Sequence, residues 1–453
     1  MSVCMNICMW VFDMLKKVFK SAVLLLMIVG IILGISITFE KAIPEKKHKE
    51  AESNVLNMIQ TKTAEATSFY TYGRAFNISG KFSNISKDNF ESAKLFITDG
   101  IDYEETYALN YKFEEGNLVF FSEEAMNIGI TIDKLKSNSE YYVLLRLKLN
   151  NSVNPKYYSF SNASDNTESI DYYTVTSDGT NKKVNIGFNK IDYNNKQYNL
   201  LTLKLEDTSL PEDVYDIVID AGHGGKDVGE KQGTVTEADI TLEYAKLLKQ
   251  RLEEDGYKVK LTRDDDNTKS YTYTNMYDED GRIGIACSSK AKLMISFHVN
   301  NGVKNLNGFE IYAPSKSDLK FAEEMANKIN EYSSISFSNN TSFKKFDGVY
   351  VKNFTPNVIK EYTATANKKG YEPYNITTNT PYLYTIREVG GIATEAYVDG
   401  RNTAYSANKY YNSNQGIECY QIELGYIKND LEIMQNEKEN YIRAIEESIK
   451  NNF

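Results

Sequence analysis

The hydrophobic pattern of this 453-residue chain changes near residue 211, and the change requires two different folds in series. Before it, short segments rich in Tyr, Ile, Val and Leu alternate with clusters of Asn, Gly, Ser and Asp, a rhythm typical of an all-β sandwich. After it, apolar strands alternate with helical stretches, which indicates an α/β domain. We therefore expect a β-rich accessory domain at residues 66–210 and an α/β domain at 214–453.

An apolar segment near the N-terminus predicts a membrane anchor. Lys20 is the only charged residue between Val18 and Phe39, and about 20 such residues suffice to span a bilayer. Lys16 and Lys17 precede the segment, so the positive-inside rule keeps the N-terminus in the cytoplasm and the remainder outside. A cleaved signal peptide is the alternative, but the run is longer than a usual signal core and no Ala-X-Ala-like site follows. We expect a cytoplasmic tip and a single-pass transmembrane helix at 1–40.

The segment between the anchor and the β-rich domain, residues 41–65, is polar and predicts a linker with at most a short helix near Val55–Ile59. The β-rich domain has no histidine and no close acidic cluster, so we expect a spacer or a wall-binding module. The net charge of −10 argues against nucleic acid as a partner, because phosphate binding needs clustered Lys and Arg.

Two of the three histidines occupy matching positions. His223 follows the apolar segment Ile217–Ile219 in a glycine-rich loop, and His298 follows Leu293–Phe297. Glycines around His223 allow a sharp bend and close approach of a ligand. A lone histidine is more often an ordinary core or loop residue, but two at strand ends of an α/β sheet predict a metal site.

A third metal ligand is expected, because catalytic zinc usually takes three protein groups and leaves one position for water. Glu237 is the best candidate, since Thr236 and Asp239 form a capping-box pattern that starts a helix there. A carboxylate in a first helical turn is also favourable for the helix dipole alone.

Five stretches resemble type 3 N-acetylmuramoyl-L-alanine amidases. They are VIDAGHGGKDVG, TEADITLEYAKLLKQRLEEDGYKVKLTRDDD, RIGIACSSKAKLMISFHVNNG, GFEIYA and IELGYIKND. They follow the family's order and cover most of residues 215–435. The resemblance implies a mixed β-sheet flanked by helices, Zn²⁺ bound by His223, Glu237 and His298, and Glu423 as the catalytic carboxylate.

The chemistry agrees with these roles. Zinc lowers the pKa of water to about 7, and an unligated carboxylate such as Glu423 is then needed to move the proton to the leaving nitrogen. Three other glutamates compete for that role: Glu310, Glu388 and Glu395.

The chain departs from the family pattern in two places. Val299, beside His298, is branched where the family often has a small residue, and we expect it to crowd the zinc mouth slightly. The region Pro314–Gln415 is long and only loosely placed. Within it, Arg387 could hold a peptide carboxylate through a bidentate contact or form an ordinary ion pair. Arg387 and Asn300 are the candidate substrate-binding residues.

We therefore expect a membrane-anchored zinc hydrolase that cuts the amide bond between N-acetylmuramic acid and L-alanine in peptidoglycan, with its catalytic domain outside the cytoplasmic membrane. Two alternatives remain. One is a zinc peptidase acting on the stem peptide, since His/Glu/His ligation is shared among zinc hydrolases. The other is a non-catalytic wall-binding or regulatory protein.

Overall fold

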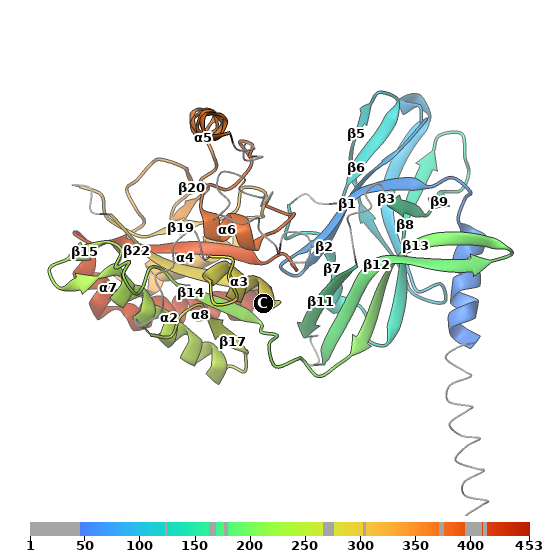
Figure 1. Cartoon of the computed structure of the whole chain (residues 1–453). Coiled ribbons are helices and arrows are strands. Elements are labelled where there is room, and N and C mark those ends of the chain that lie inside the picture. The colour runs from blue at the N-terminus through green and yellow to red at the C-terminus, as the bar shows by residue number, and fades with distance from the viewer. Residues whose placement is uncertain are drawn as a thin grey trace, which may run out of the picture.

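The computed structural model describes most of the chain after residue 45. The described ranges are 46–122, 125–162, 169–175, 180–265, 276–301, 305–370, 376–394, 410 and 415–453. The predicted anchor at 1–40 lies outside them. No helix within these ranges is both long and apolar enough to cross a bilayer. Figure 1 shows an all-β domain beside an α/β domain, in the order that the sequence predicts.

The N-terminal domain is built from two packed sheets. Its strands are β1 (Ala64–Tyr72), β2 (Ala75–Phe82), β3 (Phe90–Thr98), β4 (Glu104–Ala108), β5 (Asn110–Glu114), β6 (Asn117–Phe121), β7 (Ile130–Thr131), β8 (Ser139–Leu149), β9 (Lys156–Tyr158), β10 (Phe160–Asn162), β11 (Ile170–Val175), β12 (Asn181–Tyr193) and β13 (Lys196–Asp207). One sheet has the order β10-β1-β2-β6-β5 and the other β11-β12-β13-β8-β3-β4. Alternate residues such as Ile78 and Phe120 from the first sheet pack against Leu95 and Val143 from the second, which gives a sandwich core.

A helix at residues 46–58 replaces most of the expected linker. Its apolar residues Ala51, Val55 and Leu56 are buried against the outer face of the second sheet, where Phe96 and Leu200 lie. The polar residues between them dilute this stripe in the sequence, so only a short helix was expected there. The described part of the linker is therefore docked on the β-domain.

The C-terminal domain has a seven-stranded mixed sheet flanked by helices, as the resemblance implied. Its strands are β14 (Ile217–Ala221), β17 (Val259–Leu261), β18 (Leu293–Asn300), β19 (Glu310–Tyr312), β20 (Lys344–Phe346), β21 (Val349–Tyr350) and β22 (Glu418–Tyr426), with a separate hairpin of β15 (Lys231–Gln232) and β16 (Val235–Thr236). The sheet order is β17-β14-β18-β22-β19-β21-β20. Strands β17, β14, β18 and β22 are parallel, and β19 is antiparallel to β22.

Helices cover both faces of this sheet. They are α2 (Glu237–Glu254), α3 (Arg282–Ser288), α4 (Lys320–Tyr332), α6 (Tyr384–Val389), α7 (Leu431–Asn436) and α8 (Lys438–Asn452). Helix α5 (Pro356–Lys369) lies apart from the sheet and packs on Phe354 and Ile376 (Figure 1). Ile219, Ile295 and Ile422 pack toward α2, α4 and α8, whereas Val218 and Met294 pack toward α3 and α6. Side chains alternate along a strand, so the neighbours of each isoleucine on its own strand point to the α3 and α6 side.

The two domains meet at the amino end of β22. The turn between β1 and β2 lies there, and the Gly73 N–H donates to the carbonyl of Gly416 at 2.8 Å. A β-carbon on Gly73 would lie 2.6 Å from a Glu418 carboxylate oxygen, so only glycine allows this approach. Asn127 also donates to Glu418 at 2.8 Å. The β-domain therefore contacts the end of the sheet opposite the carboxyl ends of the parallel strands.

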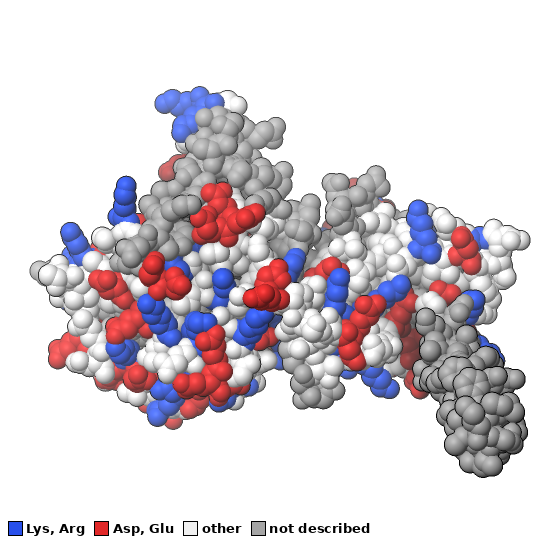
Figure 2. Space-filling model, turned by 60° about the horizontal axis from the view of Figure 1, so that its bottom comes forward, with Lys and Arg blue, Asp and Glu red and all other residues white. Residues whose placement is uncertain are grey.

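Acidic and basic side chains are interspersed over the face of the molecule seen in Figure 2. Both signs occur on both domains on this face.

Candidate metal centre and active site

A buried charge network supports the loop that carries His223. This residue follows β14 and has a positive φ of 61°, a backbone conformation uncommon outside glycine. Arg282 donates to the His223 carbonyl at 2.9 Å and forms an ion pair with the buried Asp220. Asp220 also accepts hydrogen bonds from Thr262 and Ser296, both at 2.7 Å. Burial alone would raise the pKa of Asp220, but the Arg282 charge and these hydrogen bonds hold it below its usual value. The network fixes the loop against the sheet.

Three side chains converge at the carboxyl ends of β14 and β18. Glu237 Oε1 lies 3.1 Å from His223 Nε2 and 3.1 Å from His298 Nδ1. The three candidate ligand atoms all lie within 4.8 Å of one another. Zinc bonds of about 2 Å in a tetrahedron place ligand atoms roughly 3.3 Å apart. The residues and their spacing therefore fit a zinc ion.

Backbone groups hold the Glu237 carboxylate in place. Its Oε1 accepts from the Val299 N–H at 2.8 Å and its Oε2 from the Glu230 N–H at 2.9 Å. The predicted capping box of Thr236 and Asp239 is present and starts α2 at this residue. Burial would raise the pKa of Glu237, but its contacts with the two histidines hold the pKa far below its usual value. The carboxylate is thus ionised and positioned before any metal binds.

His223 is oriented from its other side by Asp227, whose carboxylate lies 3.0 Å from His223 Nδ1. Such a partner fixes the ring and makes the opposite nitrogen a better ligand. Burial alone would lower the pKa of His223, but Glu237 and Asp227 raise it to about 9. His298 Nε2 is buried and has no hydrogen-bond partner among the described residues. The cluster as a whole attracts positive charge, as a cation site does.

Glu423 lies beside this cluster on the neighbouring strand. It is the Cα partner of His298 across β22 and β18, and it is 8% exposed. Gln421 donates to Glu423 at 2.8 Å and itself accepts from Thr385 of α6 at 3.1 Å. Burial raises the pKa of Glu423 to about 7, assisted by the charge of Glu237 and opposed by His298 and Gln421. A carboxyl group with a pKa near neutrality can both take and release a proton.

The competing glutamates are committed elsewhere. Glu310 is the Cα partner of Glu423. Its carboxylate accepts from four donors, namely Tyr312, Ser338, Asn340 and Tyr426. Glu388 is buried and pairs with Arg387 at 2.7 Å. Glu395 lies outside the described residues. Of the described candidates, Glu423 is the one placed to act beside the histidines.

The two candidate substrate-binding residues differ in their surroundings. Arg387 is 8% exposed and donates to Glu388 and to the carbonyls of Pro381 and Tyr382. These contacts account for Arg387 as an ion-paired residue that anchors α6. Asn300 ends β18 close to His298, and its side-chain nitrogen is buried without a partner among the described residues. Of the two, Asn300 has a donor left for a ligand.

Val299 does not crowd the metal centre, contrary to the expectation from its branched side chain. It is 3% exposed and packs in the core on the α2 side of the sheet, away from the face that carries His298. The alternation of side chains along β18 is the physical reason. Only the backbone of Val299 contributes to the centre, through its hydrogen bond to Glu237.

Gly222→Ala is expected to weaken metal binding at least about tenfold, because overpacking of this kind costs about 1–3 kcal/mol. The added β-carbon would lie 2.6 Å from His298 Cε1 and 2.7 Å from Nε2, so the ring must move. Metal affinity measured by competition with a chromogenic chelator would test this. Gly116→Ala, between β5 and β6 of the β-domain, is the control: its β-carbon meets nothing within 4 Å, and any strain from its positive φ stays away from the metal centre. Equal affinities in the two variants would contradict the proposed geometry.

Comparisons with known proteins place this domain among amidases. Residues 217–452 match the family described as N-acetylmuramoyl-L-alanine amidase. The uncharacterized protein YqiI of Bacillus subtilis (strain 168) is 28% identical over 165 residues, which cover 35% of this chain and 76% of YqiI. The germination-specific N-acetylmuramoyl-L-alanine amidase of the same organism is 38% identical over 98 residues, which cover 20% of this chain and 41% of that amidase. The amidase AmiC2 of Nostoc punctiforme matches at 23% identity with a TM-score of 0.32, over 53% of this chain and 96% of AmiC2. The match to the germination-specific amidase thus spans less than half of that protein.

Proposed function

Because the chain belongs to the N-acetylmuramoyl-L-alanine amidase family, we propose that it is a zinc-dependent enzyme that hydrolyses the amide bond between N-acetylmuramic acid and L-alanine in peptidoglycan. The observation that carries the proposal is the convergence of His223, Glu237 and His298 beside the buried Glu423. A ligand set of three with a separate carboxylate suits amide hydrolysis, which needs both an activated nucleophile and a proton carrier.

His223, Glu237 and His298 would hold the zinc. When bound, zinc supplies a Lewis acid that polarises a carbonyl group and lowers the pKa of water to about 7. Asp227 keeps the His223 ring in its ligating orientation, and the backbone N–H groups of Val299 and Glu230 keep the Glu237 carboxylate in place. The protein thus prepares the ligand geometry in advance.

Glu423 would take the proton of the attacking water and deliver it to the leaving nitrogen of L-alanine. Its pKa of about 7 suits both halves of this transfer. The hydrogen bond from Gln421 holds one carboxylate oxygen, Oε1, in a fixed position. The other oxygen, Oε2, would carry the proton. Asn300 would donate to the substrate, because its buried amide nitrogen has no partner among the described residues.

We also propose that residues 1–40 anchor the chain in the cytoplasmic membrane with both folded domains outside. The uninterrupted apolar run Val18–Phe39 and the lysines before it support this. The helix at 46–58 follows shortly afterwards and packs on the β-domain. The β-domain would then act as a spacer that carries the catalytic domain toward the wall, its substrate.

Treatment of the full-length chain with a chelator is expected to abolish the release of soluble fragments from purified peptidoglycan, and added Zn²⁺ is expected to restore it. The reason is that zinc would lower the pKa of the attacking water, and that effect is lost when the metal is removed. Metal content is measured in parallel by mass spectrometry. Full activity in metal-free protein would overturn the zinc proposal. Wall binding without release at any metal content would support a non-catalytic protein instead.

A further inference from the structure

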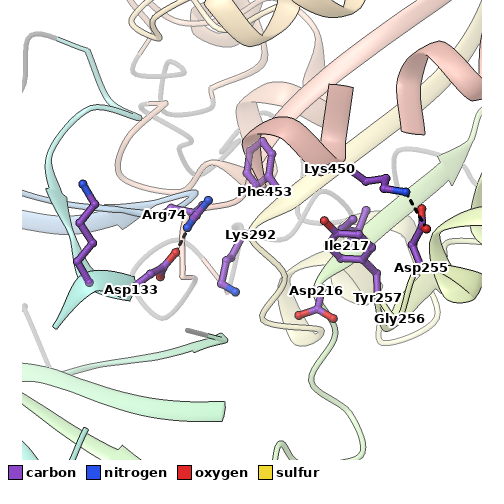
Figure 3. Close-up of a pocket in the computed structure, with 11 residues that line it drawn as sticks. Arg74, Asp133, Asp216, Ile217, Asp255, Gly256, Tyr257, Lys292, Lys450 and Phe453 are labelled. Carbon is purple, nitrogen blue, oxygen red and sulfur yellow. Dashed lines mark hydrogen bonds and ion pairs between the residues drawn. The ribbon is translucent and has the colours of Figure 1, made fainter. Parts of the chain in front are cut away.

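A cavity lies between the two domains, at the amino end of the catalytic sheet. Its volume is about 620 Å³, which is within the range of small-molecule sites, roughly 300–1,000 Å³. Arg74 and Asp133 line it from the β-domain, whereas Asp216, Tyr257 and Lys292 line it from the α/β domain (Figure 3). The metal centre is at the other end of the sheet, so this cavity is separate from it.

The carboxylates of the cavity already have partners. Asp133 pairs with Arg74 at 2.5 Å, and Asp255 pairs with Lys450 at 2.8 Å. The Asp216 carboxylate accepts from the Lys258 N–H at 2.8 Å. Arg74 also donates to the carbonyl of Asn452 at 3.0 Å, so its guanidinium is engaged on two sides.

Lys292 is different. Among the described residues no hydrogen bond or ion pair is formed by its ammonium, which points into the cavity between Asp133 and Asp216 in Figure 3. Burial lowers the pKa of this ammonium, and the charges of the two aspartates offset only part of that effect. The backbone of Lys292 is fixed, because its N–H donates to Asp216 and its carbonyl accepts from Glu418. A partly buried and unpaired charge on a fixed backbone gains free energy from an anionic partner.

We propose that this cavity binds a small ligand with a single carboxylate, which accepts hydrogen bonds from Lys292 Nζ while the apolar part of the ligand lies against Tyr257 and Phe453. Four cationic side chains and three carboxylates line the cavity, so one negative charge balances it. A phosphate dianion would exceed this balance by one negative charge, although Lys134, an exposed lining residue, is a second cation beside Lys292. The ligand would touch both domains and so stabilise their arrangement. This site goes beyond the hydrolytic function and its test does not depend on hydrolysis.

Calorimetric titration of the full-length chain with N-acetylalanine tests the proposal. N-acetylalaninamide serves as the uncharged counterpart and inorganic phosphate as the dianion. We expect binding of N-acetylalanine alone. Lys292→Gln should weaken it at least about tenfold, the effect of losing one hydrogen bond to a charged group, and Lys292→Arg should largely retain it. Lys112→Gln, on an exposed strand of the β-domain, should bind as the unaltered chain does.

The variants also exclude the metal centre as the source of the signal, because carboxylates bound to zinc would bind equally in all of them. Equal binding of the amide, binding of phosphate alone, no binding of any probe, or unchanged affinity in Lys292→Gln would each overturn the proposal. Should Lys292→Gln fail to fold, the acid and the amide are compared on chain freed of metal by a chelator that is then dialysed away, and binding of the acid alone decides for the cavity.

Discussion

Replacing Glu423 with Gln is expected to lower the rate of peptidoglycan hydrolysis by about 10²–10⁴-fold, the usual contribution of a general acid–base group. The amide has nearly the shape of the carboxylate but cannot take a proton from water. Glu423 is not one of the three candidate metal ligands, so the zinc content of the variant should be unchanged. The rate of fragment release and the zinc stoichiometry are the two measurements.

Glu432→Gln provides the matched control for this substitution, because Glu432 is an exposed residue of α7 away from the centre. It should hydrolyse at the rate of the unaltered chain. A Glu423→Gln variant that retains more than about a tenth of the rate would transfer the proton-carrying role to another group.

The second large effect is expected at the metal site. Glu237→Ala should reduce zinc affinity by more than about 100-fold, beyond the 10–100-fold range of outer-shell changes, and reduce hydrolysis to background. Its carboxylate lies between both histidine rings, so its loss removes a ligand and leaves two rings without a common partner. Competition with a chromogenic chelator measures the affinity.

Asp227→Asn gives a graded comparison for Glu237→Ala. Asp227 reaches the three candidate ligands only through the far nitrogen of His223, so we expect a loss of about 10–100-fold in zinc affinity. The experiment tests whether Glu237→Ala loses more zinc affinity than Asp227→Asn does. A larger loss in Asp227→Asn, or normal zinc binding by Glu237→Ala, would contradict the assignment of ligands.

The sequence predicted the neighbourhood of the metal centre well because the signals there are local. The glycine-rich turn around His223, the capping box before Glu237 and the apolar strand before His298 each lie within a few residues of the side chain that they position. The structure brings these three side chains together, and their role as zinc ligands is a prediction that the variants above test. The change of pattern near residue 211 falls between β13, which ends at Asp207, and β14, which begins at Ile217.

Other features depend on residues far apart in the chain and could not be predicted from sequence. Val299 faces the core because of strand alternation, and a shift of one residue in the expected pattern reverses the face. Glu310 is excluded as a proton carrier by donors that come from as far away as Tyr426. The helix at 46–58 gains its stability from contact with residues such as Phe96 and Leu200. No local pattern in the sequence records these contacts.

The contacts between the two domains also join residues that are far apart in the chain. Lys292 is one of many lysines in the sequence, and only the meeting of the two domains places its ammonium in a cavity beside Asp133. The approach of Gly73 to Glu418 also joins residues that are far apart in the chain. The relation between the β-domain and the catalytic sheet therefore had to come from the structure.

The most direct test of the central proposal is mass spectrometry of the products after purified peptidoglycan is digested with the full-length chain. Zinc-loaded protein, chelator-treated protein and Glu423→Ala are compared. We predict zinc-dependent release of intact stem peptides with a free L-alanine amine, absent from the other two samples. Cleavage within the stem peptide instead would identify a peptidase, and the absence of any product from zinc-loaded protein would contradict an enzymatic role.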